Sequence, residues 1–177
     1  MIPVLHSERL TFRAWRESDL APMAAFYADA TMSRFVRGPM GKDDVWRRIA
    51  LEIGHWALRG YGRWALEEKS TGEFVGWAGL WYPHGFPARE IGWGLVKAKQ
   101  GNGYASEAAR RARAYAYETL GWDTVASVIA LDNTPSIKVA QRLGATREGD
   151  AEFAGMACAI YRHPSRANLA SEANAIP

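Results

Sequence analysis

Hydrophobic and polar residues alternate along residues 9–15 with the two-residue period of a half-buried strand. Ser18 then offers a hydroxyl as a helix N-cap, and apolar residues recur at helical spacing from Leu20 to Tyr27. A loop that contains Gly38-Pro39 separates this short helix from a second one. The apolar stripe expected on the second helix is Trp46, Ile49, Ile53 and Trp56.

Apolar segments in the middle of the chain predict three antiparallel strands. Residues 63–67 and 74–81 flank the turn residues Ser70-Thr71-Gly72, as in a β-hairpin. Residues 90–96 return as a third strand, which is rich enough in glycine to suggest a bulge or a closely bound ligand.

The second half of the chain predicts a helix, a strand, a helix and two strands. Their expected ranges are 103–119, 124–130, 135–143, 145–149 and 155–161. Asn133 or Thr134 is the expected cap of the second of these helices.

The predicted order β-α-α-β-β-β-α-β-α-β-β implies an α+β (α/β layered) fold with helices on both faces of the sheet. The sheet is expected to be mixed and mostly antiparallel, with about seven strands. We expect a single domain over residues 1–165, and residues 166–177 are expected to form a loosely ordered polar tail.

Composition restricts the classes of function. The chain has 177 residues, which fits one domain, and a formal net charge of +3, which by itself does not indicate a nucleic-acid partner. The single cysteine, Cys158, cannot form an internal disulfide, and the four histidines do not have zinc-site spacing. Because the histidines lack this spacing, we expect no metal, and because a signal-peptide pattern and a long apolar run are lacking, we expect a cytoplasmic protein with no membrane partner.

The segment Gln100-Gly101-Asn102-Gly103-Tyr104-Ala105 joins a predicted strand to a predicted helix. The N–H groups at the start of a helix have no intrahelical acceptor, and glycines let a phosphate oxygen approach them. Pyrophosphate is therefore the natural ligand, whereas the alternative is a simple glycine turn. The segment lacks the third glycine of a dinucleotide-binding fingerprint and the Gly-Lys-Ser/Thr of a Walker A loop.

With this loop, the sequence resembles the GNAT superfamily of acyl-CoA-dependent N-acyltransferases, whose phosphate loop is Gln/Arg-x-x-Gly-x-Gly/Ala. The resemblance covers nearly the whole chain, and it is strongest to the branch of ribosomal-protein alanine and serine N-acetyltransferases. It implies a sheet in which the fourth and fifth strands splay apart around acetyl-CoA. The motifs that carry it are Arg9–Arg13, Glu90–Trp93, the loop, Asn133–Ser136 and Gln141–Gly144.

The resemblance also implies which residues contact acetyl-CoA. Trp93, Gly94 and Leu95 are expected to offer backbone groups to the acyl group and the pantetheine. Asn133 matches an asparagine near the pantetheine, although it could equally serve as the helix cap. The expected pyrophosphate contacts are Gln100, Gly101, Asn102, Gly103, Tyr104, Ala105 and Ser106.

The family's chemistry is direct attack of an amine on the thioester, with an acid that protonates the leaving thiolate. Many members use a tyrosine seven residues after the matching asparagine, but this position is Ala140 here. Ser136 matches a serine near the thiol in the ribosomal-protein branch and is the candidate acid. Its alternative role is a second capping hydroxyl.

Glu90 is the first candidate for the general base, because a partly buried carboxylate has its pKa raised toward neutrality. The alternative is a solvent-facing charge paired with Arg89 or another basic residue. His84 is the second candidate base. Some protein acetyltransferases have a catalytic glutamate at the position of Val128, so their mechanism is not transferred whole.

The amine acceptor is expected between the loops at residues 35–40, 81–87 and 150–155. Aromatic residues that could line its site are Trp77, Trp81, Tyr82, Phe86 and Trp93. The segment 97–113 holds five basic residues and one glutamate, a local excess of +4, which favours a compact polyphosphate over a nucleic acid.

We therefore expect an acetyl-CoA-dependent N-acetyltransferase that acts on a primary amine, either a protein N-terminus or a small molecule. The alternative is a non-catalytic domain that binds acyl-CoA or regulates another protein. We expect a monomer or a homodimer.

Overall fold

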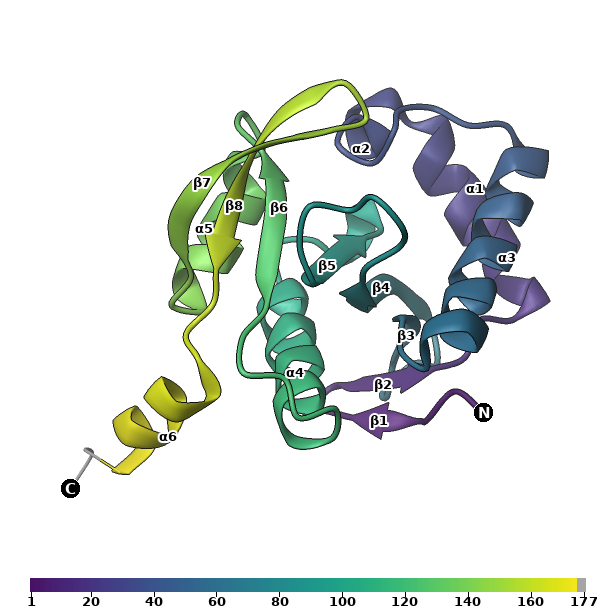
Figure 1. Ribbon diagram of the computed structural model, residues 1–177. Coiled ribbons are helices and arrows are strands. Elements are labelled where there is room, and N and C mark those ends of the chain that lie inside the picture. Colours follow the sequence, from purple (N-terminus) through teal and green to yellow (C-terminus); the bar gives the residue numbers. More distant parts are fainter. Residues whose placement is uncertain (175–177) are drawn as a thin grey trace.

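The computed structural model describes residues 1–174 and contains one mixed sheet of eight strands in the order β1-β2-β3-β4-β5-β6-β8-β7 (Figure 1). All neighbouring strands are antiparallel except β5 and β6, which run parallel. The strands are β1 (Leu5–His6), β2 (Leu10–Arg13), β3 (Arg63–Glu68), β4 (Phe74–Trp81), β5 (Glu90–Leu95), β6 (Ala126–Ala130), β7 (Thr146–Phe153) and β8 (Met156–Arg162). The helices are α1 (Leu20–Ala28), α2 (Ala30–Ser33), α3 (Lys42–Arg59), α4 (Tyr104–Glu118), α5 (Thr134–Arg142) and α6 (Arg166–Asn174).

The fold class is confirmed, including the hairpin of β3 and β4. The sheet has one strand more than expected, because the two-residue β1 pairs with β2 and is too short to produce a periodic pattern. The last hairpin is longer than expected, since β7 continues to Phe153. Residues of β7 are mostly exposed, so this edge strand lacks the apolar alternation that would reveal its length.

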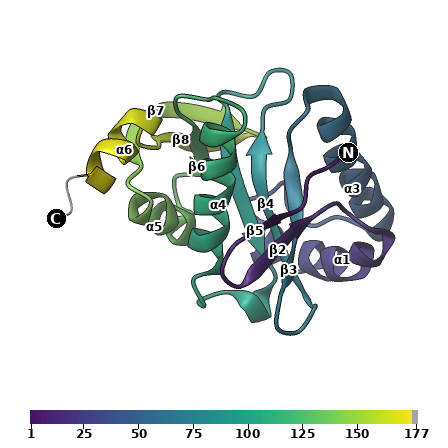
Figure 2. The ribbon, with the colours of Figure 1, turned by 90° about the horizontal axis from the view of Figure 1, so that it is seen from below.

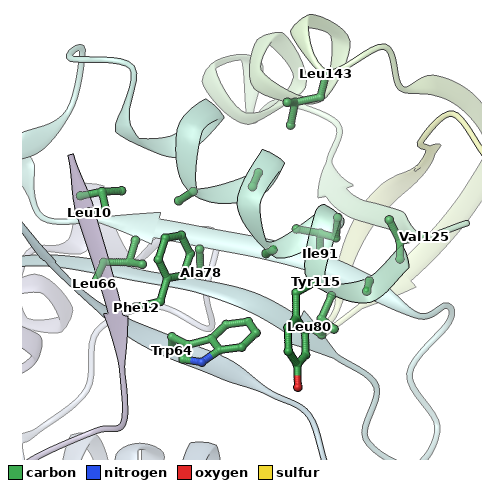
Figure 3. Close-up of a cluster of buried hydrophobic side chains, with 14 of the residues drawn as sticks. Leu10, Phe12, Trp64, Leu66, Ala78, Leu80, Ile91, Tyr115, Val125 and Leu143 are labelled. Carbon is green, nitrogen blue, oxygen red and sulfur yellow. The ribbon is translucent and has the colours of Figure 1, made fainter. Parts of the chain in front are cut away.

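Helices cover both faces of the sheet, with α1 and α3 on one face and α4 and α5 on the other (Figures 1 and 2). Consecutive residues of β3 illustrate this arrangement. Trp64 and Leu66 pack into the cluster that includes α4 (Figure 3), whereas Ala65 packs with residues of α1 and α3. Because side chains of a strand alternate between faces, one strand contributes to both cores.

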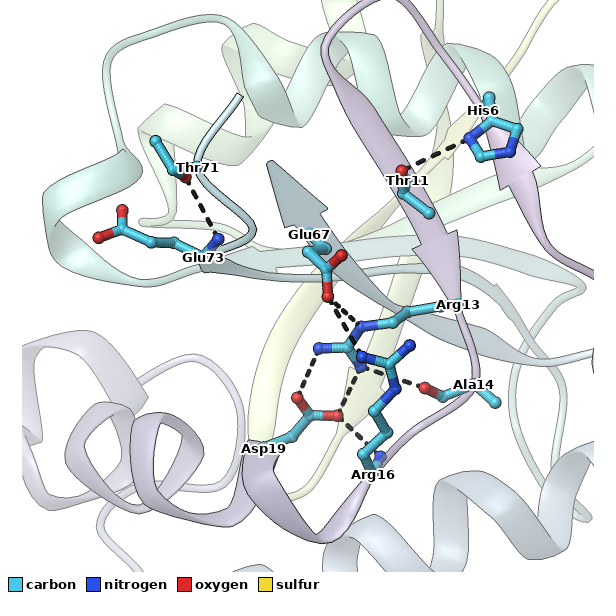
Figure 4. Close-up of polar contacts among 9 residues, drawn as sticks. All are labelled: His6, Thr11, Arg13, Ala14, Arg16, Asp19, Glu67, Thr71 and Glu73. Atoms are coloured by element: carbon cyan, nitrogen blue, oxygen red, sulfur yellow. Dashed lines mark hydrogen bonds and ion pairs between the residues drawn. The ribbon is translucent and has the colours of Figure 1, made fainter. Parts of the chain in front are cut away.

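A buried ion-pair cluster attaches the start of α1 to the sheet (Figure 4). The Arg13 guanidinium contacts Asp19 through two nitrogens at 2.8 and 2.9 Å and donates to Glu67 at 2.7 Å. Asp19 occupies the N-cap position of α1. Ser18 is therefore not the cap that the sequence predicts, because the helix begins one residue later.

The inward face of α3 differs from the expected apolar stripe. Ile49 and Trp56 are buried as expected, but Trp46 and Ile53 are 51% and 44% exposed. The inward positions include the polar residues Glu52 and His55, which are buried. A helix face that carries buried charge cannot be found from the positions of its apolar residues alone.

The end of the chain is helical in the part that the structure describes. Residues 166–174 form α6, and Leu169 packs against the main core cluster, in the segment for which the sequence predicts a polar tail. Residues 175–177 lie outside the described part. Among the helices of residues 1–174, we find none with the length and apolar content that crossing a membrane requires.

Candidate active site

The parallel strands β5 and β6 separate at the centre of the sheet. Within residues 1–174 they share one paired position, Glu90 with Ala126, and a pocket that is partly open to solvent lies between the diverging strands. Residues from both strands, from the loops after α2 and β4, from β7 and from the start of α5 line this pocket. The splayed cleft that the resemblance implies is therefore present.

The glycine loop lies between β5 and α4. Gly101 and Gly103 have φ angles of +78° and +81°, which L-residues rarely adopt, and Gly103 is the N-cap of α4. A Cβ atom on Gly101 would meet no atom within 4 Å, and one on Gly103 would meet only the Arg9 side chain at 3.5 Å. This open space next to the first N–H groups of α4 fits a phosphate group.

Side chains hold the loop in this conformation. Gln100 donates from Nε2 to the Leu95 carbonyl at 3.1 Å, and Asn102 donates to the Gln100 carbonyl at 3.1 Å. Arg9 donates to the Asn102 carbonyl at 2.9 Å and pairs with Glu107 at 2.7 Å. Arg9 is the loop contact that sequence reasoning missed, since it lies far from the loop along the chain.

Lys99 and Arg113, two of the five basic residues near the loop, are already engaged by other groups of the chain. Lys99 contacts Glu68 at 2.7 Å and Glu73 at 2.6 Å, and Arg113 is buried and donates to the Leu143 carbonyl. The bond from Lys99, together with that from the Tyr104 hydroxyl, lowers the pKa of Glu68 to about 2. The local excess of +4 therefore overstates the charge available to a polyphosphate.

The expected acyl-group contacts on β5 have different surroundings. Trp93 lines the pocket, and Leu95 belongs to the buried core. Gly94 backs onto Trp77, because a Cβ atom there would lie 2.2 Å from Cζ2 of the indole ring. The neighbour that requires a glycine at this position is thus the Trp77 side chain.

Asn133 and Ser136 both line the pocket at the start of α5. The Asn133 side chain accepts a hydrogen bond from the Ser136 N–H at 3.3 Å, which confirms the capping role. Within residues 1–174 the Ser136 hydroxyl makes no hydrogen bond. It is therefore not a second cap, and it remains available to a ligand in the pocket.

Glu90 is 6% exposed and lines the pocket. It accepts hydrogen bonds from Arg63 at 2.9 Å and from the Val128 N–H at 3.3 Å. Burial raises the pKa of Glu90, and Arg63 opposes this effect. Glu90 is thus not a solvent-facing charge, and its partner is Arg63 rather than Arg89, whose guanidinium lies over the Trp122 ring. His84 is exposed and does not line the pocket.

A buried charge network continues from Glu90 to α3. Glu52 contacts Arg48 at 3.0 Å and Arg63 at 3.4 Å, and both guanidinium groups lie over the Trp81 ring. Oε2 of Glu52 and Nε of Arg63 have no hydrogen-bond partner in the described part of the chain, although both atoms are buried. Sequence reasoning did not predict this network. Polar residues that recur at helical spacing next to Ile49 in α3 were the pattern that could have indicated it.

His55 completes the wall behind Trp81. Its ring stacks on Trp81 at 4.4 Å, and its Nε2 accepts from the Tyr82 N–H at 3.1 Å. The proton of the neutral ring is then on Nδ1, which donates to the Tyr61 carbonyl at 2.8 Å. Burial lowers the pKa of His55, so the ring acts as a neutral structural support.

The three segments expected around the acceptor do meet at the pocket. Phe86 contacts Phe153 at 5.1 Å between ring centroids, and the Arg37 guanidinium lies 5.5 Å from the centroid of the Phe153 ring. Of the expected aromatic residues, Tyr82 does not line the pocket; those that do are Trp77, Trp81, Phe86 and Trp93. Cys158 is buried in β8.

Comparisons with known proteins agree with this geometry. Residues 9–146 match the acetyltransferase (GNAT) domain family. The chain is similar to the uncharacterized N-acetyltransferase YoaA of Bacillus subtilis (strain 168), with 26% identity over 84% of this chain and 86% of that protein. It is also similar to the crystal structure of an acetyltransferase from Agrobacterium tumefaciens, with a TM-score of 0.84, 33% identity, and coverage of 92% of this chain and 95% of that one.

The spermidine N-acetyltransferase from Vibrio cholerae, solved in complex with CoA and spermine, has the same fold. Its TM-score is 0.71 at 18% identity, with 90% of this chain and 97% of that chain covered.

Proposed function

The chain belongs to the GNAT acetyltransferase family and is an N-acetyltransferase, and we propose that it transfers an acetyl group from acetyl-CoA to a primary amine by direct attack. The observation that carries this proposal is the pocket between β5 and β6, which Glu90 and Ser136 both line. The residues available for the two proton transfers thus share one pocket in the cleft of the sheet.

Acetyl-CoA supplies the acetyl thioester, and the residues of this chain bind it and move protons. The loop from Gln100 to Ser106 offers the N–H groups of the first turn of α4 to the pyrophosphate. Trp93, Gly94, Leu95 and Asn133 are proposed to hold the acyl group and the pantetheine.

Glu90 accepts the proton that the amine loses as its nitrogen bonds to the acetyl carbon. Ser136 donates a proton to the sulfur as the carbon–sulfur bond breaks, and solvent returns that proton. Burial supports Glu90 in this role because it raises the carboxylate's pKa.

The acceptor is an amine of a small molecule or of a protein N-terminus. The motifs resemble those of the ribosomal-protein branch, which supports the second class. Release of free thiol from acetyl-CoA, measured with a panel of both kinds of amine, tests the proposal. Tight binding of CoA without turnover on any amine would instead favour a non-catalytic acyl-CoA-binding domain. The cytoplasmic location also stays a prediction.

Replacing Gly103 with valine is expected to weaken CoA binding at least tenfold. A β-branched residue at a φ of +81° strains the backbone by about 1–2 kcal/mol and occupies the space left open for the phosphates. Calorimetric titration with CoA measures the effect.

Gly121→Val is the matched control, because Gly121 also has a positive φ, +67°, and open space, but it follows α4 at the opposite end from the loop. It is expected to destabilise the fold to a similar degree and to leave CoA affinity unchanged. Equal CoA affinity in both variants would contradict the assignment of the loop.

Ser136→Ala is expected to lower kcat about tenfold to a hundredfold and to leave CoA affinity unchanged, because it removes the proposed acid while Asn133 still caps α5. Steady-state kinetics with acetyl-CoA and an acceptor amine measure this. The control is Thr134→Ala, which removes an exposed hydroxyl from the same helical turn. If both variants turn over at the rate of the unmodified chain, Ser136 is not the acid.

A further inference from the structure

The charged residues that line the pocket are Arg37, Arg48, Arg63 and Glu90. Arg63 pairs with Glu90, and Glu52 behind the pocket pairs with Arg48 and Arg63. Within residues 1–174, Arg37 makes no ion pair. Together these five residues leave one positive charge uncompensated, and Arg37 is the arginine without an acidic partner.

Arg37 is an exposed residue that lines the pocket, and its backbone has an unusual conformation. Its φ angle is +87°, a left-handed value that is costly for a residue other than glycine and that clusters at functional sites. Its guanidinium lies 5.5 Å from the centroid of the Phe153 ring. The Arg48 guanidinium lies 5.2 Å from the centroid of the Trp81 ring, and Arg48 lines the same pocket.

This charge distribution distinguishes among amines. A polyamine would bring a second ammonium group toward unpaired Arg37, where like charges repel. A carboxylate would compensate the excess charge and accept hydrogen bonds from the planar guanidinium groups. The excess grows by one positive charge when Glu90 takes up the proton of the attacking amine.

We propose that the acceptor is an amine that also carries a carboxylate, and that Arg37 and Arg48 bind this carboxylate. This inference rests on the proposed acetyl transfer, because it names the acceptor class of the same pocket. The carboxylate can belong to a free amino acid or to a peptide, and the chemistry of recognition is the same. The phenyl rings of Phe35, Phe86 and Phe153 suit an apolar side chain beside it.

The experiment compares kcat/KM for acceptors that differ in one group. L-Phenylalanine is paired with L-phenylalaninamide, and the dipeptide Phe-Ala is paired with its C-terminal amide; spermidine is the polyamine. For at least one pair, the kcat/KM of the acid is expected to exceed that of its amide by about tenfold or more, because the amide lacks the charge-assisted hydrogen bond. The acid that reacts shows whether the carboxylate belongs to a free amino acid or to a peptide. The inference is overturned if both amides, or spermidine, react at a rate equal to or higher than that of the acids.

Arg37→Gln is expected to reduce the preference for the acid about tenfold. Arg47→Gln is the matched control, because it removes an exposed arginine that pairs with Asp44 and does not line the pocket. Arg37→Gly is a second variant, which relieves the left-handed backbone and so is expected to raise the melting temperature while it abolishes the preference. A loss that accompanies a gain in stability cannot arise from unfolding.

A binding measurement separates this inference from the proposed reaction. Calorimetry of the CoA-saturated protein compares N-acetyl-L-phenylalanine and N-acetyl-Phe-Ala with their amides and requires no turnover. If none of the amines releases thiol but an acid still binds at least tenfold tighter than its amide, the proposed reaction fails and carboxylate recognition stands. If amines react but neither acid is preferred in rate or binding, the carboxylate inference fails and the reaction stands.

Discussion

Glu90→Gln is expected to lower kcat/KM for the acceptor by about 100-fold or more at neutral pH, the range for removal of a general base. Glutamine keeps the shape of the side chain and an oxygen for Arg63, but it cannot accept the proton of the amine. CoA affinity is expected to stay unchanged, because Glu90 lies at the start of β5 and the phosphate loop follows its other end. Thiol release and calorimetric titration measure the two quantities.

The pH dependence of kcat/KM distinguishes a base from a structural carboxylate. Glu90 acts as a base only when ionised, so activity is present above its pKa and is lost as the pH falls through it. Since burial raises this pKa, the loss is expected at a higher pH than for an exposed glutamate. The residual activity of Glu90→Gln is expected not to show this loss at low pH. If the loss persists in that variant, it contradicts the assignment of Glu90 as the base.

Glu67→Gln is the matched control for this variant. Glu67 also belongs to a strand and contacts a buried arginine, Arg13, at 2.7 Å, but it does not line the pocket. It is expected to change stability without changing the pH profile. A similar loss of activity in both variants would indicate that the effect of Glu90 comes from the fold.

Gly94→Val is expected to destabilise the fold by about 3 kcal/mol, the upper part of the usual range for overpacking. A Cβ atom at this position would lie 2.2 to 2.6 Å from three atoms of the Trp77 indole. Trp77 packs against Phe26 at 4.9 Å and stacks with Tyr27 at 6.3 Å, so a shift of the ring would disturb these contacts. Urea denaturation measures the change in the free energy of unfolding.

Two variants make this result specific. Gly149→Val places the same side chain in β7, where a Cβ atom meets nothing within 4 Å, and the free energy of unfolding is expected to change by about 0.5 kcal/mol or less. Adding Trp77→Leu to Gly94→Val is expected to recover part of the loss, which a double-mutant cycle detects as a coupling energy. Additive effects would show that Trp77 is not the cause.

Local signals in the sequence were sufficient for most of the elements. Three local patterns each specify a structure within a few residues: the turn Ser70-Thr71-Gly72, the glycines just before Tyr104, and the Asn133 cap. The helices and strands next to them form as expected. The position of the glycine loop before α4 was also predictable, because a glycine-rich strand-to-helix connection is itself a local pattern. Errors are found where the local signal was weak, as in β1 and the exposed β7.

The sequence by itself thus determined the order of the elements, the glycine loop and the identity of Glu90 and Ser136 as candidates. Only the tertiary structure decided that Glu90 is buried against Arg63, which is 27 residues away, and that Arg9 holds a loop 93 residues away. The physical reason is the range of the forces involved. Backbone preferences act between neighbours in the chain, whereas burial, charge pairing and the shape of a pocket depend on residues that meet only after the sheet has formed.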